Sequence, residues 1–381
     1  MGELSLYIHI PFCVRKCNYC DFLSAACDEN TKQKYVNALC KEIEQRAEGF
    51  EDRKVDTIFF GGGTPSILSI GQMEKIMWAV RKAFLIQTDA EITMEMNPGT
   101  VDREKLEAYK RFGINRLSIG LQSANNEELK ILGRIHTWEE FLQTWKMVRE
   151  VGFTNVNIDL MSALPGQTFK SYEETLRKVL ALKPEHISAY SLIVEEGTPF
   201  YEWFGEDGKR RNEIPNEIVD RQMYELTKNL LEEQGYFRYE ISNYALKGYE
   251  CKHNVGYWKR KEYLGLGLGA ASLISNIRST NITDMSTYLE VENGDWTEEQ
   301  IKLSLNDQME EFMFLGLRMM EGICPVEFEG KFERALQEVY GEQLEKLEQQ
   351  KLLEYNRKTG RYALTMAGID VSNQVFVEFL F

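Results

Sequence analysis

Three cysteines, Cys13, Cys17 and Cys20, form a C-x3-C-x2-C cluster immediately after the first predicted strand. Three thiolates at this spacing can bind three corners of a [4Fe–4S] cube and leave the fourth iron without a protein ligand. An iron that is open in this way is a coordination site for a small chelating molecule. Ferredoxin clusters use four cysteines, and a structural zinc site needs four ligands. The alternatives are three reduced thiols in a loop, or a zinc site that His9 completes.

Strand-like apolar segments alternate with amphipathic helical patterns from residue 4 to about residue 193. Repeated β–α units of this kind predict a parallel sheet. The predicted strands are residues 4–10, 55–60, 91–97, 115–121, 155–161 and 185–193. Predicted helices between them include residues 31–47, 71–84, 138–150 and 169–182.

Four of these strands alternate apolar and polar residues. In the first strand, Leu6 and Ile8 lie on one face, whereas Tyr7 and His9 lie on the other. A parallel sheet that helices cover on both sides should be apolar on both faces. One polar face per strand therefore predicts a curved, partly open barrel whose lumen holds a polar ligand.

The residues around the cysteines carry a resemblance to a known family. The segment Cys17-Asn18-Tyr19-Cys20-Asp21-Phe22 resembles the cluster loop of the oxygen-independent coproporphyrinogen III oxidase (HemN-like) superfamily of radical SAM proteins, and within it the heme chaperone branch, HemW. The resemblance implies an α/β fold, a partial (β/α)6 barrel with a C-terminal winged-helix-like α+β domain. The oxidase branch carries one more cysteine two positions after the third, where this chain has Phe22.

The resemblance also implies S-adenosylmethionine as a cofactor beside the cluster. The glycine triplet 61–63 follows a predicted strand and resembles the segment that contacts the methionine amino group. Glycines allow the backbone to approach a ligand closely. The residues that the resemblance places around the cofactors are Tyr7, Tyr19, Gly63, Thr64, Glu95, Gln122, Arg134 and Asp159. Glu95 is expected to accept from the amine or the ribose hydroxyls, and Asp159 and Arg134 suit the ribose and the carboxylate.

A second motif lies beyond the predicted barrel. The segment His253-Asn254-x-x-Tyr257-Trp258 resembles the HNxxYW motif of heme chaperones. An imidazole can ligate heme iron, and the two aromatic residues offer broad apolar faces. The expectation is a heme pocket of His253, Tyr257 and Trp258, with Cys251 as the alternative iron ligand. The following glycine-rich segment has Ala271 where many members of the family have histidine.

The C-terminal part has the pattern of a small separate domain. Helical patterns at 298–320 and 326–353 precede short predicted strands at 353–356 and 361–364 and a last helix at 366–379. Helices with a β-hairpin suggest a winged-helix-like module. Residues 297–381 contain 16 acidic and nine basic residues, a balance that argues against nucleic-acid binding. The predicted domains are a barrel at 1–200, a barrel extension with HNxxYW at 201–296, and this module at 297–381.

The bulk properties predict a cytoplasmic protein. The chain has 381 residues and a formal net charge of −15, which argues against a nucleic-acid or anionic-membrane surface as partner. No signal peptide or apolar segment of membrane length is visible. Scattered cysteines such as Cys40, which lies on an apolar helical stripe, do not suggest a disulfide framework.

The leading interpretation is a heme chaperone that carries a [4Fe–4S] cluster and S-adenosylmethionine and passes heme to an unidentified acceptor protein. The resemblance allows a membrane-associated acceptor and a homodimer. The second interpretation is an oxygen-independent coproporphyrinogen III oxidase, which starts oxidative decarboxylation with a 5′-deoxyadenosyl radical. A third, a winged-helix regulator with an iron–sulfur sensor, conflicts with the acidic charge of the chain.

Overall fold

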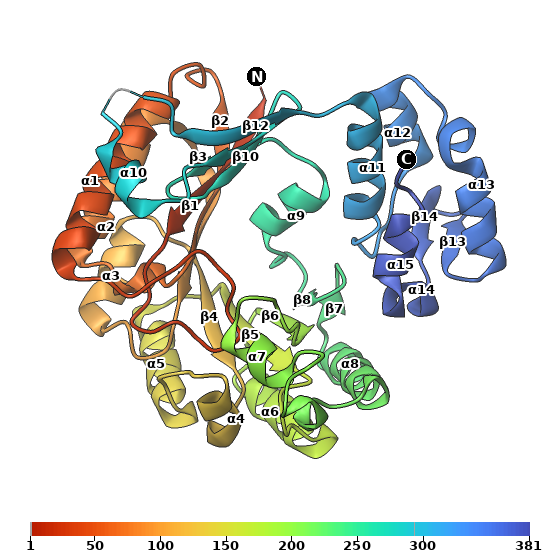
Figure 1. Cartoon of the computed structure of the whole chain (residues 1–381), viewed down its shortest axis with the longest axis horizontal. Helices are drawn as coiled ribbons and strands as arrows, with labels where there is room; N and C mark the ends of the chain where they lie inside the picture. The colour runs from red at the N-terminus through yellow and green to blue at the C-terminus, as the bar shows by residue number, and fades with distance from the viewer. Residues whose placement is uncertain (1, 293) are drawn as a thin grey trace.

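The computed structural model describes residues 2–292 and 294–381. Six parallel strands lie side by side in chain order and curve into an open barrel with helices on its outer side (Figure 1). The strands are β1 (Glu3–Ile10), β2 (Lys54–Gly62), β3 (Leu85–Met96), β4 (Arg116–Gln122), β5 (Val156–Ser162) and β6 (His186–Ser191). The connecting helices are α1 (Glu29–Arg46), α2 (Ile70–Ala83), α3 (Arg103–Arg111), α4 (Asn126–Ile131), α5 (Trp138–Val151) and α6 (Phe169–Ala181). The partial (β/α)6 barrel predicted from the sequence is confirmed.

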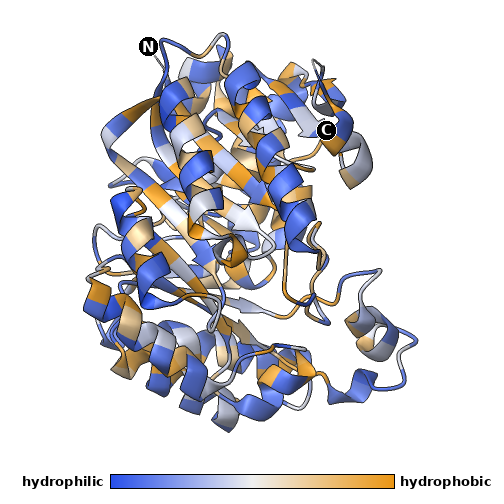
Figure 2. Cartoon of the chain, turned by 90° about the vertical axis from the view of Figure 1, so that its left-hand side faces the viewer, coloured by the Kyte–Doolittle hydropathy of each residue, from blue (hydrophilic) through white to orange (hydrophobic). Residues whose placement is uncertain are grey.

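Local sequence explains where the outer helices begin and end. Capping boxes open α2 at Ser69, α5 at Thr137 and α6 at Thr168. In each box the hydroxyl accepts a bond from a free N–H group of the first turn, which has no partner within the helix. Helix α5 ends at Gly152, whose φ of 90° is accessible to glycine. Figure 2 shows hydrophilic and hydrophobic bands alternating along these helices, as expected of helices with one buried side.

The two faces of the barrel strands differ as the alternation predicts. Leu6 and Ile8 of β1 are completely buried against the helices. On the lumen side, Ser118 and Gln122 of β4 are buried polar residues. The lumen of the barrel is therefore lined by groups that can bind a polar ligand.

The sheet continues beyond both edges of the barrel to a total of 12 strands among the described residues. Next to β1 lie β9 (Tyr263–Leu266), β10 (Ala271–Ile274), β11 (Ile277–Asn281) and β12 (Thr297–Lys302), and next to β6 lie β8 (Asn243–Ala245) and β7 (Phe237–Arg238). Outside the sheet in this part of the chain are α7 (Pro199–Phe204), α8 (Glu217–Glu233), α9 (Lys252–Trp258) and α10 (Met285–Glu290). Helix α9, which carries the HNxxYW motif, lies between the barrel and the C-terminal module (Figure 1).

The predicted helix at 298–320 is wrong in its first part. Residues 297–302 form β12, which pairs antiparallel with β11 in the large sheet. The helix α11 begins only after Ser304, whose hydroxyl forms a capping box with Asp307. Pairing with a neighbouring strand overrides the helical propensity of Glu, Gln and Lys in this segment.

The C-terminal module consists of helices and one two-stranded hairpin, as predicted. Its elements are α11 (Leu305–Gly316), α12 (Pro325–Phe332), α13 (Leu336–Gln349), β13 (Leu353–Asn356), β14 (Arg361–Leu364), α14 (Met366–Asp370) and α15 (Ser372–Val377). Two predicted helices are each divided into two. Glu333, with φ of 54°, ends α12, and the non-helical backbone of Val371 separates α14 from α15. The module has its own hydrophobic core, built around Phe328 and Leu344.

A buried ion pair joins the module to the barrel. Nε of Arg260, just after α9, lies 2.6 Å from a carboxylate oxygen of Glu311 in α11, and both side chains are almost completely buried. Among the described residues, no helix combines the length and the apolar character that crossing a membrane requires.

Candidate cofactor site at the carboxyl ends of the strands

The cysteine loop continues directly from β1 and lies over the carboxyl ends of the strands. Cys13, Cys17 and Cys20 are free thiols and are half-buried. The amide of Cys13 donates to the carbonyl of Ala25 at 3.0 Å, and the amide of Asn18 donates to the carbonyl of Leu132 at 3.0 Å. The loop is thus fixed by backbone bonds on both sides while its thiols stay accessible.

Two of the three thiols have polar partners. The Thr64 hydroxyl lies 3.5 Å from Sγ of Cys13, and Nη1 of Arg134 lies 3.6 Å from Sγ of Cys17. Burial raises the pKa of the Cys20 thiol. The hydroxyl and the guanidinium are donors that can also bond the sulfur of an iron-bound cysteine.

The zinc alternative requires His9 as a fourth ligand beside the three thiols. Within residues 2–292 and 294–381, no three His, Cys, Asp or Glu side chains converge closely enough to bind one metal ion. In a cubane cluster each cysteine binds a different iron, so the thiols lie further apart. The ring nitrogens of His9 are bonded to the Tyr7 hydroxyl at 3.0 Å and the Leu23 carbonyl at 2.9 Å. His9 is therefore not a free fourth ligand for zinc.

The glycine triplet allows the end of β2 to pass close to the cysteine loop. A Cβ atom on Gly63 would lie 2.5 Å from the carbonyl oxygen of Phe12. Gly62 has a φ of 106°, and a Cβ atom there would lie 2.4 Å from the ring of His9. Close packing within the chain thus requires these glycines, in addition to any contact with a ligand.

Asn97, which was not among the residues predicted from the sequence, connects two of them. Its amide donates to the Thr64 hydroxyl at 2.8 Å, and its carbonyl oxygen accepts from Nη2 of Arg134 at 2.6 Å. Arg134 also donates to the carbonyl of Gly120. The signal in the sequence was a polar residue directly after the strand that carries Glu95.

Two carboxylates, Glu95 and Asp159, influence each other electrostatically in the lumen. Burial and the nearby charge of Asp159 raise the pKa of Glu95 to about 8. Burial also raises the pKa of Asp159, which accepts from Nδ2 of Asn157 at 2.6 Å and from the hydroxyl of Ser118 at 3.3 Å. A cationic ligand would stabilise both carboxylates, so the lumen is suited to a positively charged molecule.

Gln122, Tyr7 and Tyr19 complete the set predicted around the cofactors. Gln122 has a φ of 72° at an irregularity of β4, and its carbonyl oxygen accepts from the hydroxyl of Tyr190 at 3.2 Å. Backbone strain of this kind is frequent at ligand sites. Tyr7 shares its hydroxyl with His9, and the half-buried Tyr19 packs near Phe200.

The HNxxYW motif lies at the opposite end of the lumen from the cysteines. The ring of His253 is stacked on Phe59 with centroids 5.1 Å apart, and Phe59 is in turn stacked on Tyr7 at 6.3 Å. Helix α9 thus forms a floor beneath the cofactor lumen.

The motif does not present a free iron ligand. Nδ1 of His253 lies 2.8 Å from the Thr57 hydroxyl, and Nε2 lies 3.0 Å from the Tyr257 hydroxyl. His253 is 1 % exposed, and burial lowers its pKa to about 3. Both ring nitrogens of His253 are therefore hydrogen-bonded in this structure, and iron ligation by His253 stays a prediction. Cys251 is completely buried and its pKa is raised by burial to about 12, so it is not a ready thiolate ligand.

The aromatic residues of the motif are also occupied. Tyr257 packs edge to face against Tyr263 with centroids 4.6 Å apart. The guanidinium carbon of Arg318 lies 4.4 Å from the ring centroid of Trp258. The predicted heme pocket of His253, Tyr257 and Trp258 is therefore not formed in this structure. Instead, the motif packs α9 against the barrel on one side and against the C-terminal module on the other.

A buried carboxylate that was not predicted helps to fix α9. The Glu91 carboxylate accepts from the amides of Lys252 and His253, both at 3.2 Å, at the start of the helix. Arg116 of β4 is 2 % exposed, and its Nε has no hydrogen-bond partner among the described residues. Ala271, at the start of β10, is half-buried, and the structure gives it no role in either site.

The structure therefore divides the predicted residues into two groups. Those of the first group lie around the cysteine loop and the lumen, and they are Cys13, Cys17, Cys20, Tyr7, Tyr19, Gly63, Thr64, Glu95, Gln122, Arg134 and Asp159. The second group, His253, Tyr257 and Trp258, forms the floor. The first group offers thiols for a cluster and polar groups for a cationic ligand that carries a carboxylate.

Comparisons with known proteins agree with this geometry. Residues 7–179 match the radical SAM superfamily, and residues 303–371 match the HemN C-terminal domain. The solved structure of the coproporphyrinogen III oxidase HemN from Escherichia coli, described as a radical SAM enzyme, superimposes with a TM-score of 0.86 at 25% identity, over 99% of this chain and 90% of that chain.

Curated relatives align with most of the chain. The chain is 38% identical to the heme chaperone HemW of Lactococcus lactis, over 99% of this chain and 97% of the relative. It is 37% identical to the heme chaperone HemW of Bacillus subtilis, over 99% of both chains. The Escherichia coli protein of the same name is 38% identical over 86% of both chains. The chain belongs to the HemW family of heme chaperones within the radical SAM superfamily.

Proposed function

We propose that this protein is a heme chaperone that binds a [4Fe–4S] cluster through Cys13, Cys17 and Cys20, binds S-adenosylmethionine in the lumen, and transfers heme to an acceptor protein. The observation that carries the proposal is full-length similarity to proteins named heme chaperone HemW, on a chain whose three thiols lie at the mouth of a polar lumen. The identity of the acceptor, its association with a membrane and a homodimeric state of this protein remain predictions.

The polar groups near the cysteines suit each part of S-adenosylmethionine. Arg134, within 3.6 Å of Sγ of Cys17, is suited to hold the carboxylate next to the open iron. Thr64 and Gly63 lie against the cysteine loop, where the amino group of the same molecule would be. Glu95 and Asp159 offer acceptors deeper in the lumen for the ribose hydroxyls and compensate positive charge. When bound, the cluster would supply an electron to S-adenosylmethionine, which would coordinate the iron that has no cysteine ligand.

The second candidate function is oxidation of coproporphyrinogen III, which the overall similarity to HemN favours. The position at which the oxidase branch carries an additional cysteine is Phe22, whose side chain is 62 % exposed in this structure. An exposed phenylalanine cannot replace a thiol in redox chemistry. This difference favours the chaperone.

Anaerobic reconstitution followed by two parallel assays tests the proposal. The reconstituted protein, supplied with S-adenosylmethionine and a reductant, should bind hemin and should not convert coproporphyrinogen III over multiple turnovers. Repeated turnover to protoporphyrinogen would replace the chaperone with the oxidase. Absence of hemin binding by the reconstituted full-length chain would contradict the proposed function.

A further inference from the structure

A short chain of hydrogen bonds connects the sulfurs of two cysteines, Cys13 and Cys17, through the side chain of Asn97. The Asn97 amide nitrogen donates to the Thr64 hydroxyl at 2.8 Å, and that hydroxyl lies 3.5 Å from Sγ of Cys13. On the other side, the Asn97 carbonyl oxygen accepts from Nη2 of Arg134 at 2.6 Å, and Nη1 of the same guanidinium lies 3.6 Å from Sγ of Cys17. The amide of Asn97 is thus the centre of a bridge between two of the three predicted cluster ligands.

The polarity of this bridge sets the direction of both donors. A hydroxyl group has one proton, and the Thr64 oxygen already accepts from the amide of Asn97, so its proton is left to point at Cys13. The guanidinium of Arg134 is planar, so the bond from Nη2 to Asn97 fixes the orientation in which Nη1 meets the sulfur of Cys17. Both sulfurs therefore receive a donor because of the position of one amide group.

The backbone that carries Asn97 is fixed by a tight turn. The sequence Asn97-Pro98-Gly99-Thr100 follows β3 directly, with proline at the second position and glycine at the third. Gly99 has a φ of 79°, and the Thr100 amide donates to the Asn97 carbonyl at 3.2 Å, as in a type II turn. The Thr100 hydroxyl donates to the same carbonyl at 2.7 Å. The turn limits the backbone freedom of Asn97, so its side chain has a defined place beside the cysteine loop.

Hydrogen bonds to cysteine sulfur influence the redox properties of an iron–sulfur cluster. One-electron reduction forms and breaks no bond, but it increases the negative charge on the sulfur ligands, and donors that point at them stabilise that charge. We propose that Asn97 is a positioning residue, which directs the donors of Thr64 and Arg134 at the two sulfurs and thereby raises the reduction potential of the cluster. The inference rests on the proposed binding of a cluster by the three cysteines and adds to it a residue that the sequence did not predict.

A redox titration of the reconstituted full-length protein tests the role of Asn97, with the electron paramagnetic resonance signal of the reduced cluster as the readout. Dithionite supplies the electron, and S-adenosylmethionine is omitted because it would compete for Arg134. Asn97→Asp keeps the size of the side chain but can only accept, so the Thr64 hydroxyl proton turns away from Cys13. The one-electron equilibrium should shift toward the oxidised cluster by about tenfold, which is a potential about 59 mV more negative. Asn97→Ala, which removes both bonds, should shift it in the same direction.

A double-mutant cycle with Thr64→Val separates positioning from the added charge. The negative charge of Asn97→Asp would act whether or not a hydroxyl lies beside it. If Asn97 acts through Thr64, the shift caused by Asn97→Asp should be smaller in the Thr64→Val background than in wild type, since the group that it redirects is already absent.

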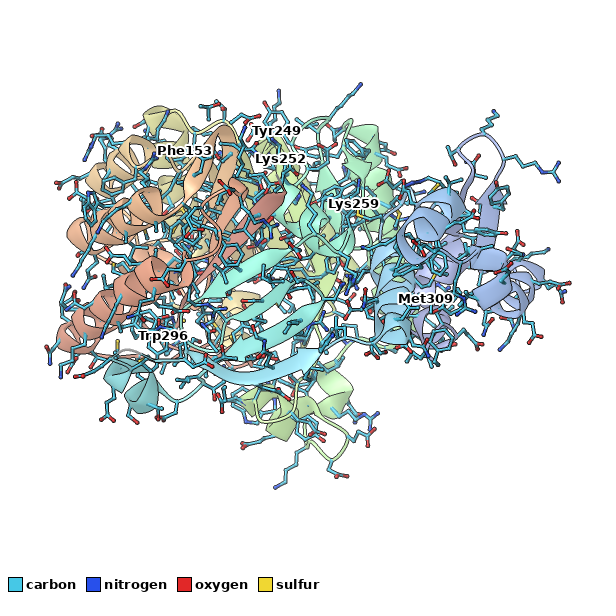
Figure 3. All side chains as sticks on the ribbon, turned by 90° about the horizontal axis from the view of Figure 1, so that it is seen from above. Phe153, Tyr249, Lys252, Lys259, Trp296 and Met309 are labelled. Atoms are coloured by element: carbon cyan, nitrogen blue, oxygen red, sulfur yellow. The ribbon has the colours of Figure 1, made fainter. Side chains whose placement is uncertain are left out.

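Asn115→Asp is the matched control. The side-chain amide of Asn115 also makes two hydrogen bonds, but it lies just before β4, at the amino end of the barrel strands and away from the cysteines. Figure 3 labels Phe153, which lies just before β5 at this same end. Asn115→Asp should lower the melting temperature and keep the wild-type potential, because it disturbs packing without reaching a sulfur.

Iron content shows which proteins hold the cluster, and the outcomes separate the inference from the proposed function. If wild type assembles no cluster, the proposed function fails and the inference fails with it. If the potentials of the Asn97 variants equal that of wild type, Asn97 does not position the donors, whereas the cluster assignment stands. Additive shifts of Asn97→Asp and Thr64→Val, an equal shift in Asn115→Asp, or loss of the cluster in both Asn97 variants would also overturn the inference. A shift that depends on Thr64 and is absent from Asn115→Asp supports it.

Discussion

The guanidinium group of Arg318 lies over the indole ring of Trp258, 4.4 Å from guanidinium carbon to ring centroid. The same arginine lies 3.6 Å from the buried carboxylate of Glu240. Trp258 ends α9, and Arg318 follows α11 of the C-terminal module. One residue of the module therefore contacts both the HNxxYW helix and the segment after β7, which suggests that the motif fixes the position of the module.

The first prediction concerns this contact. Trp258→Ala and Arg318→Ala should each lower the free energy of unfolding, and a double-mutant cycle should give a coupling of about 0.5–2 kcal/mol, because the cation and the ring interact directly. Urea unfolding of the four proteins measures it. Arg357→Ala, in the exposed hairpin turn, should change stability by less than about 0.5 kcal/mol. Additive effects of the two single variants would show that the contact contributes nothing.

The second prediction concerns the cluster. Anaerobically reconstituted protein should contain about four irons per chain and absorb broadly in the visible range. Cys17→Ala should abolish both signals, because two thiols cannot hold the cluster. Cys40→Ala should keep them, since Cys40 is a buried core residue of α1 and not part of the cysteine loop. Equal iron content in the two variants would mean that the cluster is bound elsewhere.

The third prediction separates cofactor binding from cluster assembly. Arg134→Lys should weaken S-adenosylmethionine binding by about tenfold or more, while most of the iron remains, because lysine lacks the planar donors that reach Asn97 and Gly120 together. Equilibrium binding and iron analysis of the same preparation measure both properties. Arg177→Lys, at an exposed surface pair with Glu173, is the control. Unchanged affinity in Arg134→Lys would remove this residue from the cofactor site.

The fourth prediction concerns pH. Because burial and Asp159 raise the pKa of Glu95 to about 8, the folded protein without ligand holds a proton there that the unfolded chain releases near pH 4.5. The stability that this proton provides is complete below about pH 4.5 and is lost as the pH rises through about 8. The Glu95→Gln variant has no carboxyl group at this position, so it does not lose stability in this way as the pH rises. The melting temperature of wild type relative to Glu95→Gln should therefore fall between about pH 5 and pH 9; parallel curves would contradict the raised pKa.

The same carboxyl links ligand binding to proton release. A cationic ligand such as S-adenosylmethionine favours ionised Glu95, so its affinity should increase as the pH rises toward about 8. Calorimetric titration in two buffers of different ionisation enthalpy measures the protons released. Glu95→Gln should release fewer protons than wild type. Equal proton release by both proteins would mean that another group titrates.

The fifth prediction distinguishes a packed histidine from an iron ligand. His253→Ala should lower the free energy of unfolding by about 2–4 kcal/mol without any heme, because it leaves a cavity on Phe59 and two hydroxyls, of Thr57 and Tyr257, without a partner. Chemical unfolding of the protein free of heme measures this. Asn254→Ala on the same helix should have a much smaller effect. Wild-type stability combined with loss of hemin binding in His253→Ala would restore the ligand role.

The barrel and the cysteine loop were predictable because their signals are local. Alternating strand patterns set which residues face the lumen, and the spacing of Cys13, Cys17 and Cys20 is contained in eight residues. The contacts of Asn97 and Arg134 could not be predicted, since they join residues from separate strands and loops. The motif at 253–258 did not reveal which neighbours its side chains contact. Helix α9 packs on several sides, and the periodicity of the sequence does not distinguish a helix face that packs inside the protein from one that is open to a ligand.

The order of strands in the sheet has a mechanical consequence. The strand that leads into the C-terminal module, β12, is followed by β11, β10, β9 and then β1, each hydrogen-bonded to the next. The far end of β1 is the cysteine loop. The strand that leads into the C-terminal module is therefore joined by a continuous ladder of backbone hydrogen bonds to the strand that ends at the three cysteines, so the two most distant functional elements of the chain share one sheet.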